Sequence, residues 1–213
     1  MVFSSLPFLF LFLTVVLLVS HLLPFKFRNF FLLLANLVFY AYGEPVYVLI
    51  MIASILVNFF AGVLMDKQPT QSRRRAVLVV GIVLNLVALG VFKYAGLFVD
   101  TLRGIPAFSS LPEVNIALPI GISFYTFQAV SYLIDVYWDD CEASHNFVNF
   151  ACYISLFPQL IAGPIVRYRD VNEQLVSRHE TPTLFNSGVR LFMVGMAKKV
   201  LLANQFGMLW ESV

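Results

Sequence analysis

Charged residues are scarce in this chain. Only 12% of its 213 residues are charged, against about 25% in an ordinary soluble domain. Hydrophobic residues make up 60%, and 22 residues are phenylalanine. A water-soluble fold needs more polar side chains to cover its surface than this composition supplies. The composition therefore predicts a protein whose surroundings are the lipid bilayer.

The low net charge and the lack of a cysteine metal-binding motif exclude two further classes of function. The formal net charge is only +2, and the basic residues stand in short clusters between apolar runs, so we expect no nucleic-acid partner. Cys141 and Cys152 form neither a CxxC motif nor a metal-ligand spacing. We therefore expect no metal site and interpret both cysteines as small apolar core residues.

The first apolar run lacks the features of a cleaved signal peptide. No lysine or arginine occurs in Met1 to Ser5, and no small-x-small cleavage site follows the run. Leu6–Leu23 has 18 residues, close to the about 20 that cross a hydrocarbon core. We expect a retained first span.

Seven apolar runs follow one another, and we expect each to be helical because unpaired backbone groups are costly in lipid. They are Leu6–Leu23, Phe30–Tyr42, Val46–Met65, Ala76–Phe92, Leu118–Trp138, Phe147–Val166 and Leu184–Trp210. Phe30–Tyr42 is short, so we expect it to be tilted, half-inserted or packed inside the bundle. Leu102–Ile116 and Tyr168–Pro182 are predicted loops. The fold class predicted is an all-α, multi-pass membrane protein with residues 1–213 in a single membrane domain.

Positive charge predicts the orientation of the first half. Lys26 and Arg28 follow the first run, and a second basic cluster, Lys67 with Arg73–Arg75, follows the third. The turn between the second and third runs carries only Glu44. Because lysine and arginine are enriched in cytoplasmic loops, we expect both basic loops in the cytoplasm and the amino terminus in the periplasm.

After the fourth run this simple alternation fails. Counting seven crossings would put the acidic stretch Asp139–Glu142 inside and Arg167 with Arg169 outside, which is the reverse of the usual charge pattern. We therefore expect either a re-entrant segment or a run that does not cross. Pro119, Pro158 and Pro164 supply the helix breaks that such a segment needs.

The fifth run carries a polar stripe. Gln128, Ser131 and Asp135 are spaced i, i+3 and i+7, so they share one face of a helix. Polar groups within a span normally face the bundle interior or a wet cavity. The stripe is a candidate lining of a substrate passage. Interhelical hydrogen bonding that only holds the bundle together is the alternative.

The sixth run ends in a proline-interrupted segment, SLFPQLIAGPIVRY. Two prolines with a glycine between them do not fit an unbroken helix. The freed backbone groups need polar partners, so the break belongs inside protein or beside water. The passage candidates in this segment are Gln159, Gly163, Pro164 and Arg167.

Several motifs together resemble one family. FPQLIAGPIVRY follows LPIGISFYTFQAVSYLIDVY and precedes a Gly-x-x-Lys-Lys pattern at Gly195–Lys199. With the opening VFSSLPFLFLFL and the turn LLLANLVFYAYGEP, they resemble the bacterial branch of the membrane-bound O-acyltransferases over essentially the whole chain.

The resemblance implies helices around a central funnel in the bacterial inner membrane. It implies transfer of an acetyl group from a cytoplasmic thioester such as acetyl-CoA, with no bound cofactor. The acceptor would be an alginate-like exopolysaccharide or a periplasmic partner protein. Lys198 and Lys199 are candidates for contact with donor phosphates, and a cytoplasmic anchor is the alternative.

The resemblance also implies that the catalytic histidine lies on a later segment, beyond Val213. The chain is then expected to be the amino-terminal part of the enzyme and to show no acyl transfer alone. His21 is interpreted as interfacial, and His145 and His179 as solvated loop residues near Asp140 and Glu180. No catalytic residue is assigned within the chain.

Two other classes of function fit the same features. In a carrier or channel, the polar stripe and the proline break would line the substrate path, since broken helices and intramembrane acids suit transporters equally well. A non-catalytic membrane scaffold that recruits outside partners is the third possibility.

Overall fold

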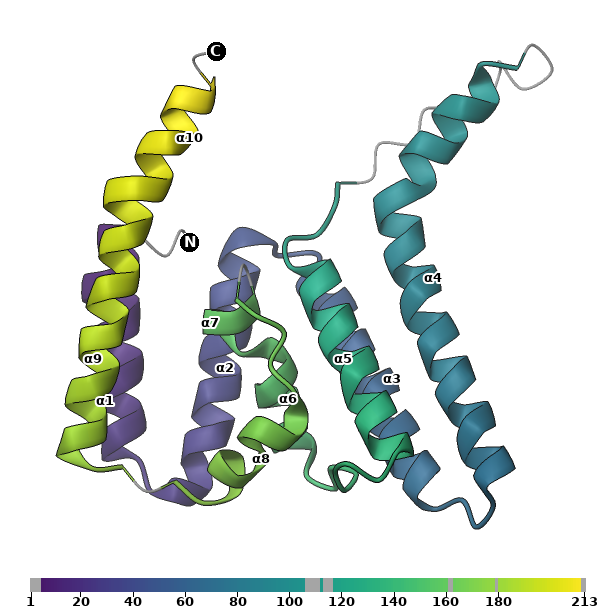
Figure 1. Ribbon diagram of the computed structural model, residues 1–213, viewed down its shortest axis with the longest axis horizontal. Coiled ribbons are helices and arrows are strands. Elements are labelled where there is room, and N and C mark those ends of the chain that lie inside the picture. The colour runs from purple at the N-terminus through teal and green to yellow at the C-terminus, as the bar shows by residue number, and fades with distance from the viewer. Residues whose placement is uncertain (1–4, 106–111, 113–116, 161–162, 179, 212–213) are drawn as a thin grey trace.

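The computed structural model describes residues 5–105, 112, 117–160, 163–178 and 180–211. Within these ranges every regular element is a helix, and most helices run along a common direction (Figure 1). The predicted all-α fold class is therefore confirmed. Among the described residues, two helices are long and apolar enough to cross a membrane by length and composition: α3, Val48–Asp66, and α4, Gln71–Arg103.

The first half follows the predicted order of apolar runs. A π-helical turn, η1 (Pro7–Leu13), continues into α1 (Thr14–Leu22), and α2 spans Phe25–Gly43. The short second run, Phe30–Tyr42, is packed inside the bundle, which was one of its three expected placements. It belongs to a longer helix: α2 has 19 residues because it begins directly after Pro24 and includes the basic turn. Helix α4 likewise extends past its apolar run, so the start of the loop predicted at Leu102–Ile116 is helical.

Helix α5 (Ile122–Tyr137) begins only after a tight turn. Gly121 has φ +77°, a conformation that side chains with a Cβ rarely adopt. A Cβ at Gly121 would also lie 2.6 Å from the carbonyl oxygen of Leu160. Glycine at this position therefore allows both the turn and the close packing of α5 against the proline-interrupted segment.

The sixth apolar run is not one helix. It forms α6 (Phe147–Ser155) and α7 (Phe157–Leu160), and residues 163–167 then run without regular structure. The chain enters the bundle from the end at which α5 finishes and returns to that same end at α8 (Figure 1). Phe147–Val166 is therefore broken, as its prolines predicted, and it returns to the end of the bundle from which it entered.

Helix α8 (Tyr168–Val176) corrects a second prediction, since Tyr168–Pro182 was expected to be an exposed loop. Tyr168, Val171 and Leu175 are spaced i, i+3 and i+7 and pack on the core, and Asp170 favours the helix start. Because this helix has only three apolar positions among mostly polar residues, its amphipathic pattern is hard to recognise in the sequence.

Ion pairs place the charged loops at one end of the bundle, which we call the basic end. Arg74 pairs with Asp139 at 2.6 Å, Arg169 with Asp140 at 3.6 Å, and Arg28 with Glu180 at 2.9 Å. The acidic stretch after α5 therefore lies beside the arginines that neutralise it. With the sixth run returning, the basic clusters share one end and the apparent reversal of the charge pattern disappears.

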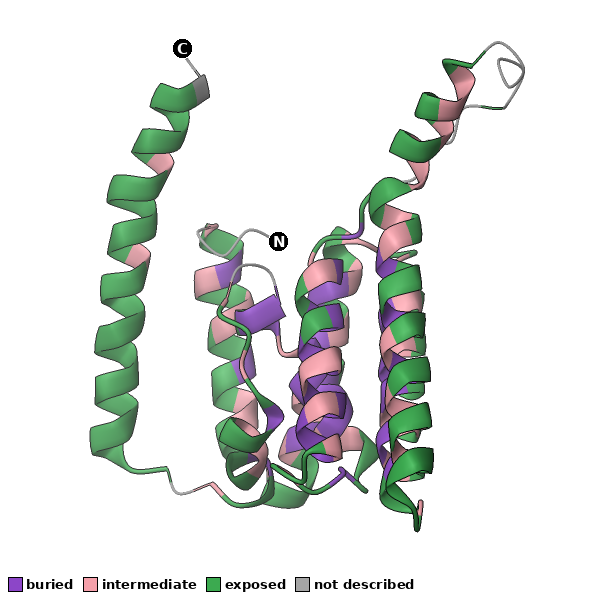
Figure 2. Cartoon of the chain, turned by 45° about the vertical axis from the view of Figure 1, so that its right-hand side comes forward, coloured by how far each residue is buried: buried purple, intermediate pink, exposed green. Residues whose placement is uncertain are grey.

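The core lies among α2, α3, α5 and α6 and is rich in aromatic rings. Cys152 belongs to it and is fully buried, as predicted, whereas Cys141 is half-buried. Helix α9 (Pro182–Ala197), the π-helical η3 (Lys198–Ala203) and α10 (Asn204–Glu211) form one continuous rod. No residue of α9 or η3 is buried, and the rod stands apart from the bundle (Figure 2).

Candidate substrate passage

At the break between α6 and α7, side chains form hydrogen bonds with the backbone groups that the interrupted helix leaves free. The carbonyl of Tyr153 would accept the N–H of Phe157 if the helix continued, but that N–H donates instead to Asn36 Oδ1 at 3.3 Å. Gln128 Nε2 and Gln159 Nε2 donate to the freed carbonyl oxygen at 3.0 and 2.7 Å. Two predicted passage residues from separate segments therefore meet on one backbone oxygen.

Asn36 of α2 holds the other side of this break. Its Nδ2 donates to Ser155 Oγ at 3.4 Å and contacts Cys152 Sγ at 3.9 Å. Ser155 Oγ in turn donates to the carbonyl of Ala151 at 2.7 Å. Asn36 and Ser155 are fully buried, so this polar network fixes where α6 ends.

The irregular returning segment, residues 163–167, is hydrogen-bonded to α6. The hydroxyl of Tyr153 donates to the carbonyl of Val166 at 2.9 Å. A Cβ on Gly163 would lie 2.8 Å from Gln159 Cα, so glycine permits the close return. Pro164 and Arg167 are exposed. These two predicted residues lie on the outer side of the returning segment, away from Gln128 and Gln159 and the carbonyl that those two residues bond.

Asp135 is the one carboxylate that is buried among the described residues, with 3% of its surface exposed. Its Oδ2 has no hydrogen-bond partner within those residues, and the charges of Arg167 and Arg169 act on it. Ser131, one turn earlier on α5, is half-buried. Gln128 and Asp135 of the stripe are thus buried in the bundle, as expected of polar groups within a span.

Three tyrosine rings from α5, α6 and α8 pack together beside this region. Tyr168 lies 5.2 Å from Tyr132 and 5.1 Å from Tyr153, centroid to centroid, and both contacts are edge-to-face. The Tyr132 hydroxyl accepts from the backbone N–H of Ser144 at 3.0 Å. On α3, Gly62 leaves room for the Tyr132 ring, which a Cβ there would meet.

Two loop groups at the basic end have shifted acidities. The Arg74 guanidinium donates to Asp139 and holds the pKa of that carboxyl below its ordinary value. Burial raises the pKa of the Cys141 thiol to about 12, and the nearby carboxylates of Asp135 and Asp140 act in the same direction. Cys141 is therefore a protonated, weakly nucleophilic thiol at neutral pH.

The remaining candidates lie elsewhere. Lys198 and Lys199 are exposed on η3. His21 is exposed and lies 3.4 Å from Glu180. The acid beside His145 is Asp66, at 3.2 Å, rather than Asp140 as expected. His179 lies outside the described residues.

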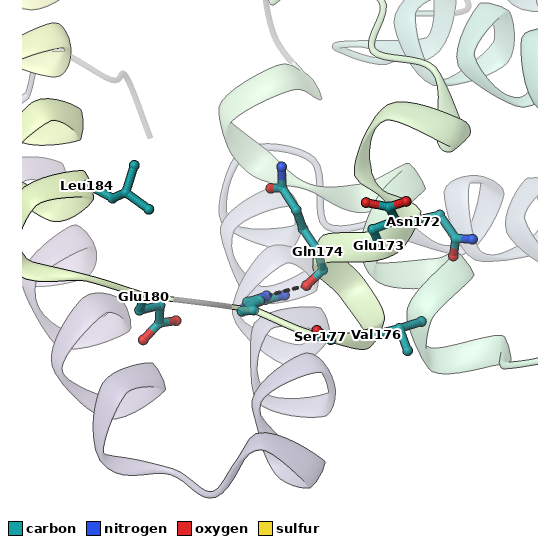
Figure 3. A pocket seen from close by; sticks show the side chains of 8 residues that line it. Asn172, Glu173, Gln174, Val176, Ser177, Glu180 and Leu184 are labelled. Carbon is teal, nitrogen blue, oxygen red and sulfur yellow. Dashed lines mark hydrogen bonds between the residues drawn. The ribbon is translucent and has the colours of Figure 1, made fainter.

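A cleft of about 790 Å³ lies between α8 and α9 and contains none of the predicted passage residues. Figure 3 shows Glu180 and Leu184 on one side of it and Glu173 and Gln174 on the other. Its lining mixes acidic, basic, amide and apolar side chains.

Sequence reasoning missed the asparagines of the apolar helices. Four of them are buried: Asn29, Asn36, Asn58 and Asn85. Asn29 Nδ2 donates to Asn149 Oδ1 at 2.8 Å and to the carbonyl of Leu175 at 2.7 Å, which joins α2 to α6 and α8. The signal was present, because a lone amide within an apolar run normally faces the interior.

Comparison with known proteins supports the motif resemblance. No family model and no solved structure matches the chain. The chain is 42% identical over 208 residues to the probable alginate O-acetylase AlgI of Pseudomonas aeruginosa, a match of 96% of this chain and 40% of the relative. For the probable alginate O-acetylase of Azotobacter vinelandii the identity is 44% over 209 residues, with 96% and 42% covered.

A third relative has a different name. The peptidoglycan O-acetyltransferase of Helicobacter pylori is 29% identical over 205 residues, with 84% of this chain and 39% of the relative covered. The chain thus spans roughly two fifths of the length of these curated relatives. The predicted resemblance is confirmed: along nearly all of its length, the chain is related to the bacterial alginate O-acetylases.

Proposed function

We propose that this chain is part of a membrane O-acetyltransferase. The enzyme transfers an acetyl group from a cytoplasmic thioester donor such as acetyl-CoA to an alginate-like exopolysaccharide or to a periplasmic partner protein. The relatives named for alginate and for peptidoglycan share O-acetylation and differ in acceptor. The acetyl group is therefore the best-supported part of the proposal, and this shared chemistry favours a transferase over a carrier or a scaffold.

The chain is proposed to lie in the bacterial inner membrane with its basic end in the cytoplasm and its amino terminus in the periplasm. Large apolar side chains are exposed along α1, α3, α4 and the α9–α10 rod, which suits lipid contact. The basic clusters gather at one end of the bundle, as the charge rule for cytoplasmic loops requires. Helices around a central funnel remain the expected architecture of the whole enzyme.

The observation that carries the proposed passage is the returning segment held against α5. Irregular backbone at membrane depth is tolerated where it is buried in protein or lines a wet cavity. Here two glutamine amides satisfy the freed carbonyl of Tyr153, and the buried carboxylate of Asp135 lies on the same helix as one of them. This segment is proposed to form one wall of the route taken by the acyl donor. Lys198 and Lys199 lie on the separate α9–α10 rod, outside this wall, and are proposed as donor contacts there.

A chimera tests the activity. The matched residues of the Pseudomonas aeruginosa alginate O-acetylase are replaced by this chain, and the acetyl-ester content of secreted alginate is measured. We expect acetylation to be restored, and to fall at least about tenfold when Gln128→Met and Gln159→Met are combined, because the wall loses its fixed geometry. Gly188→Ala, at an open position on α9, is the neutral control. A chimera that reaches the membrane at the parent's level without acetylating would contradict the proposal.

Cysteine labelling tests the orientation. In a background without native cysteines, Ser72→Cys, Ser177→Cys and Gly104→Cys are labelled with an impermeant maleimide in right-side-out and inverted vesicles. Positions 72 and 177 are expected to react from the cytoplasmic side and position 104 from the other. Labelling of 177 together with 104 would mean that the sixth run crosses the membrane.

A further inference from the structure

The turn between α3 and α4 carries four cations. Lys67 directly follows α3, and Arg73, Arg74 and Arg75 lie in the first two turns of α4. Lys67, Arg73 and Arg75 are exposed, and none of the three forms an ion pair with an acid of the described residues. We call these three residues the cationic patch.

Two acids lie close to this turn, and each has another partner. Asp139 lies 2.6 Å from Arg74, the one arginine of the turn that is outside the patch. Asp66, the last residue of α3, lies 3.2 Å from His145. The patch therefore keeps three positive charges that the described part of the chain does not pair.

The position of the patch on α4 favours a bound anion. The first turn of α4 contains no acidic residue, and the side chain of its N-cap, Thr70, makes no capping hydrogen bond. The N-terminal turn of a helix carries a partial positive charge, so a cation such as Arg73 is unfavourable there and an anion is favourable. Helix stability thus does not explain the arginines, whereas an anion beside them would relieve the repulsion.

Exposed apolar side chains adjoin the patch on both helices. Leu64 lies one turn before Lys67 on the same face of α3, and Val79 lies one turn after Arg75 on the same face of α4. Among the described residues, α3 and α4 are also the two helices long and apolar enough to cross a membrane. A phospholipid combines an anionic group with apolar chains in the same order, whereas a free phosphate would use only the cations.

We propose that the cationic patch binds the headgroup of an anionic phospholipid such as phosphatidylglycerol, whose acyl chains lie against the exposed faces of α3 and α4. Clusters of about four to eight lysines and arginines directly beside a membrane-spanning helix attract anionic lipids. The site lies on the α4 side of the bundle, away from the α9–α10 rod (Figure 1). It is separate from the proposed acyl route, and the inference rests on the membrane placement proposed above.

Native mass spectrometry tests the patch. The full chain is purified in micelles that contain equal amounts of phosphatidylglycerol and phosphatidylcholine, and the lipids retained on the protein are identified and counted. We expect phosphatidylglycerol to be retained preferentially. Arg73→Gln combined with Arg75→Gln is expected to weaken its binding about tenfold, equivalent to about 1.4 kcal/mol, whereas Arg73→Lys combined with Arg75→Lys should retain the preference.

A charge-matched control separates the patch from net charge. Lys26→Gln combined with Arg190→Gln removes two positive charges at exposed positions outside the patch and should leave phosphatidylglycerol binding nearly unchanged. An equal loss in the patch and control variants would overturn the proposal, as would equal retention of the two lipids in the wild type. Displacement of the lipid by an equal concentration of glycerol 3-phosphate would show a site for free phosphate and would also contradict it.

Vesicle flotation separates this failure from failure of the membrane placement. The chain is reconstituted with vesicles of phosphatidylcholine alone and with vesicles that also contain phosphatidylglycerol. If it floats with both but shows no lipid preference in micelles, only the patch proposal fails. If it floats with neither, the membrane placement itself fails.

Discussion

The two glutamines that share the Tyr153 carbonyl give a quantitative test of the returning segment. Gln128→Met and Gln159→Met keep side-chain length and remove the side-chain amide, including the Nε2 donor that bonds the Tyr153 carbonyl. Either single variant leaves the carbonyl with one donor, whereas the double variant leaves a buried acceptor at a helix end with none. The two substitutions are therefore expected to be non-additive.

The magnitudes follow from the geometry. Hydrogen bonds between membrane helices are worth about 0.6 kcal/mol on average and about 1.7 at most, so each single variant should lose about 0.5–1.5 kcal/mol of unfolding free energy. Leaving a buried carbonyl unsatisfied costs about 1–3 kcal/mol. The double variant should then exceed the sum of the singles by about 1 kcal/mol, within the range that double-mutant cycles report for shared partners.

The assay is equilibrium unfolding in mixed micelles for the wild type, both singles and the double. Gln68→Met provides the control, because Gln68 bonds a carbonyl of its own helix at an exposed site. It should cost little and add to Gln128→Met without coupling. If Gln128→Met and Gln159→Met add simply, the shared carbonyl does not organise the break, and the reasoning about the passage wall is refuted.

Three further predictions concern α3, α4 and the basic end. Gly62→Ala should lower the free energy of unfolding by about 1–3 kcal/mol, because the new Cβ meets the packed Tyr132 ring. Gly90→Ala has open space around it and should raise that free energy by about 0.5–1 kcal/mol. Thermal unfolding of both variants checks the opposite signs. The ion pair with Arg74 lowers the pKa of Asp139 in the folded state. The pair therefore stabilises the fold fully above the ordinary aspartate pKa of 3.8, and this stabilisation is lost as the pH falls below that value. Asp139→Asn should reduce the decrease of the unfolding midpoint at acidic pH, and an unchanged pH profile would contradict this. Cys141 should react with N-ethylmaleimide far more slowly at pH 7 than a Ser177→Cys thiol, and equal rates by mass spectrometry would rule out its raised pKa.

Particular residues show how far sequence reasoning reached. Pro158 and Pro164 with the intervening Gly163 predicted a broken segment, and the need to satisfy its freed backbone groups made Gln159 and Arg167 the candidate polar partners. The break and the Gln159 contact hold in the structure, whereas Arg167 is exposed. The role of Asn36 was not foreseen, because its partner Phe157 lies 121 residues away and no local pattern indicates that distance.

Composition, apolar runs and motif order by themselves determined the all-helical fold class, the expectation of a bilayer, the place of the helix break and the relationship to the alginate O-acetylases. These are local or additive properties, readable from hydrophobic length, proline positions and charge counts. Only the tertiary structure decided that the sixth run returns to the end it entered, that Asp139 and Arg74 lie together, and which amides meet on Tyr153. Those facts depend on contacts between distant segments, where packing and hydrogen-bond satisfaction override the period of any single run.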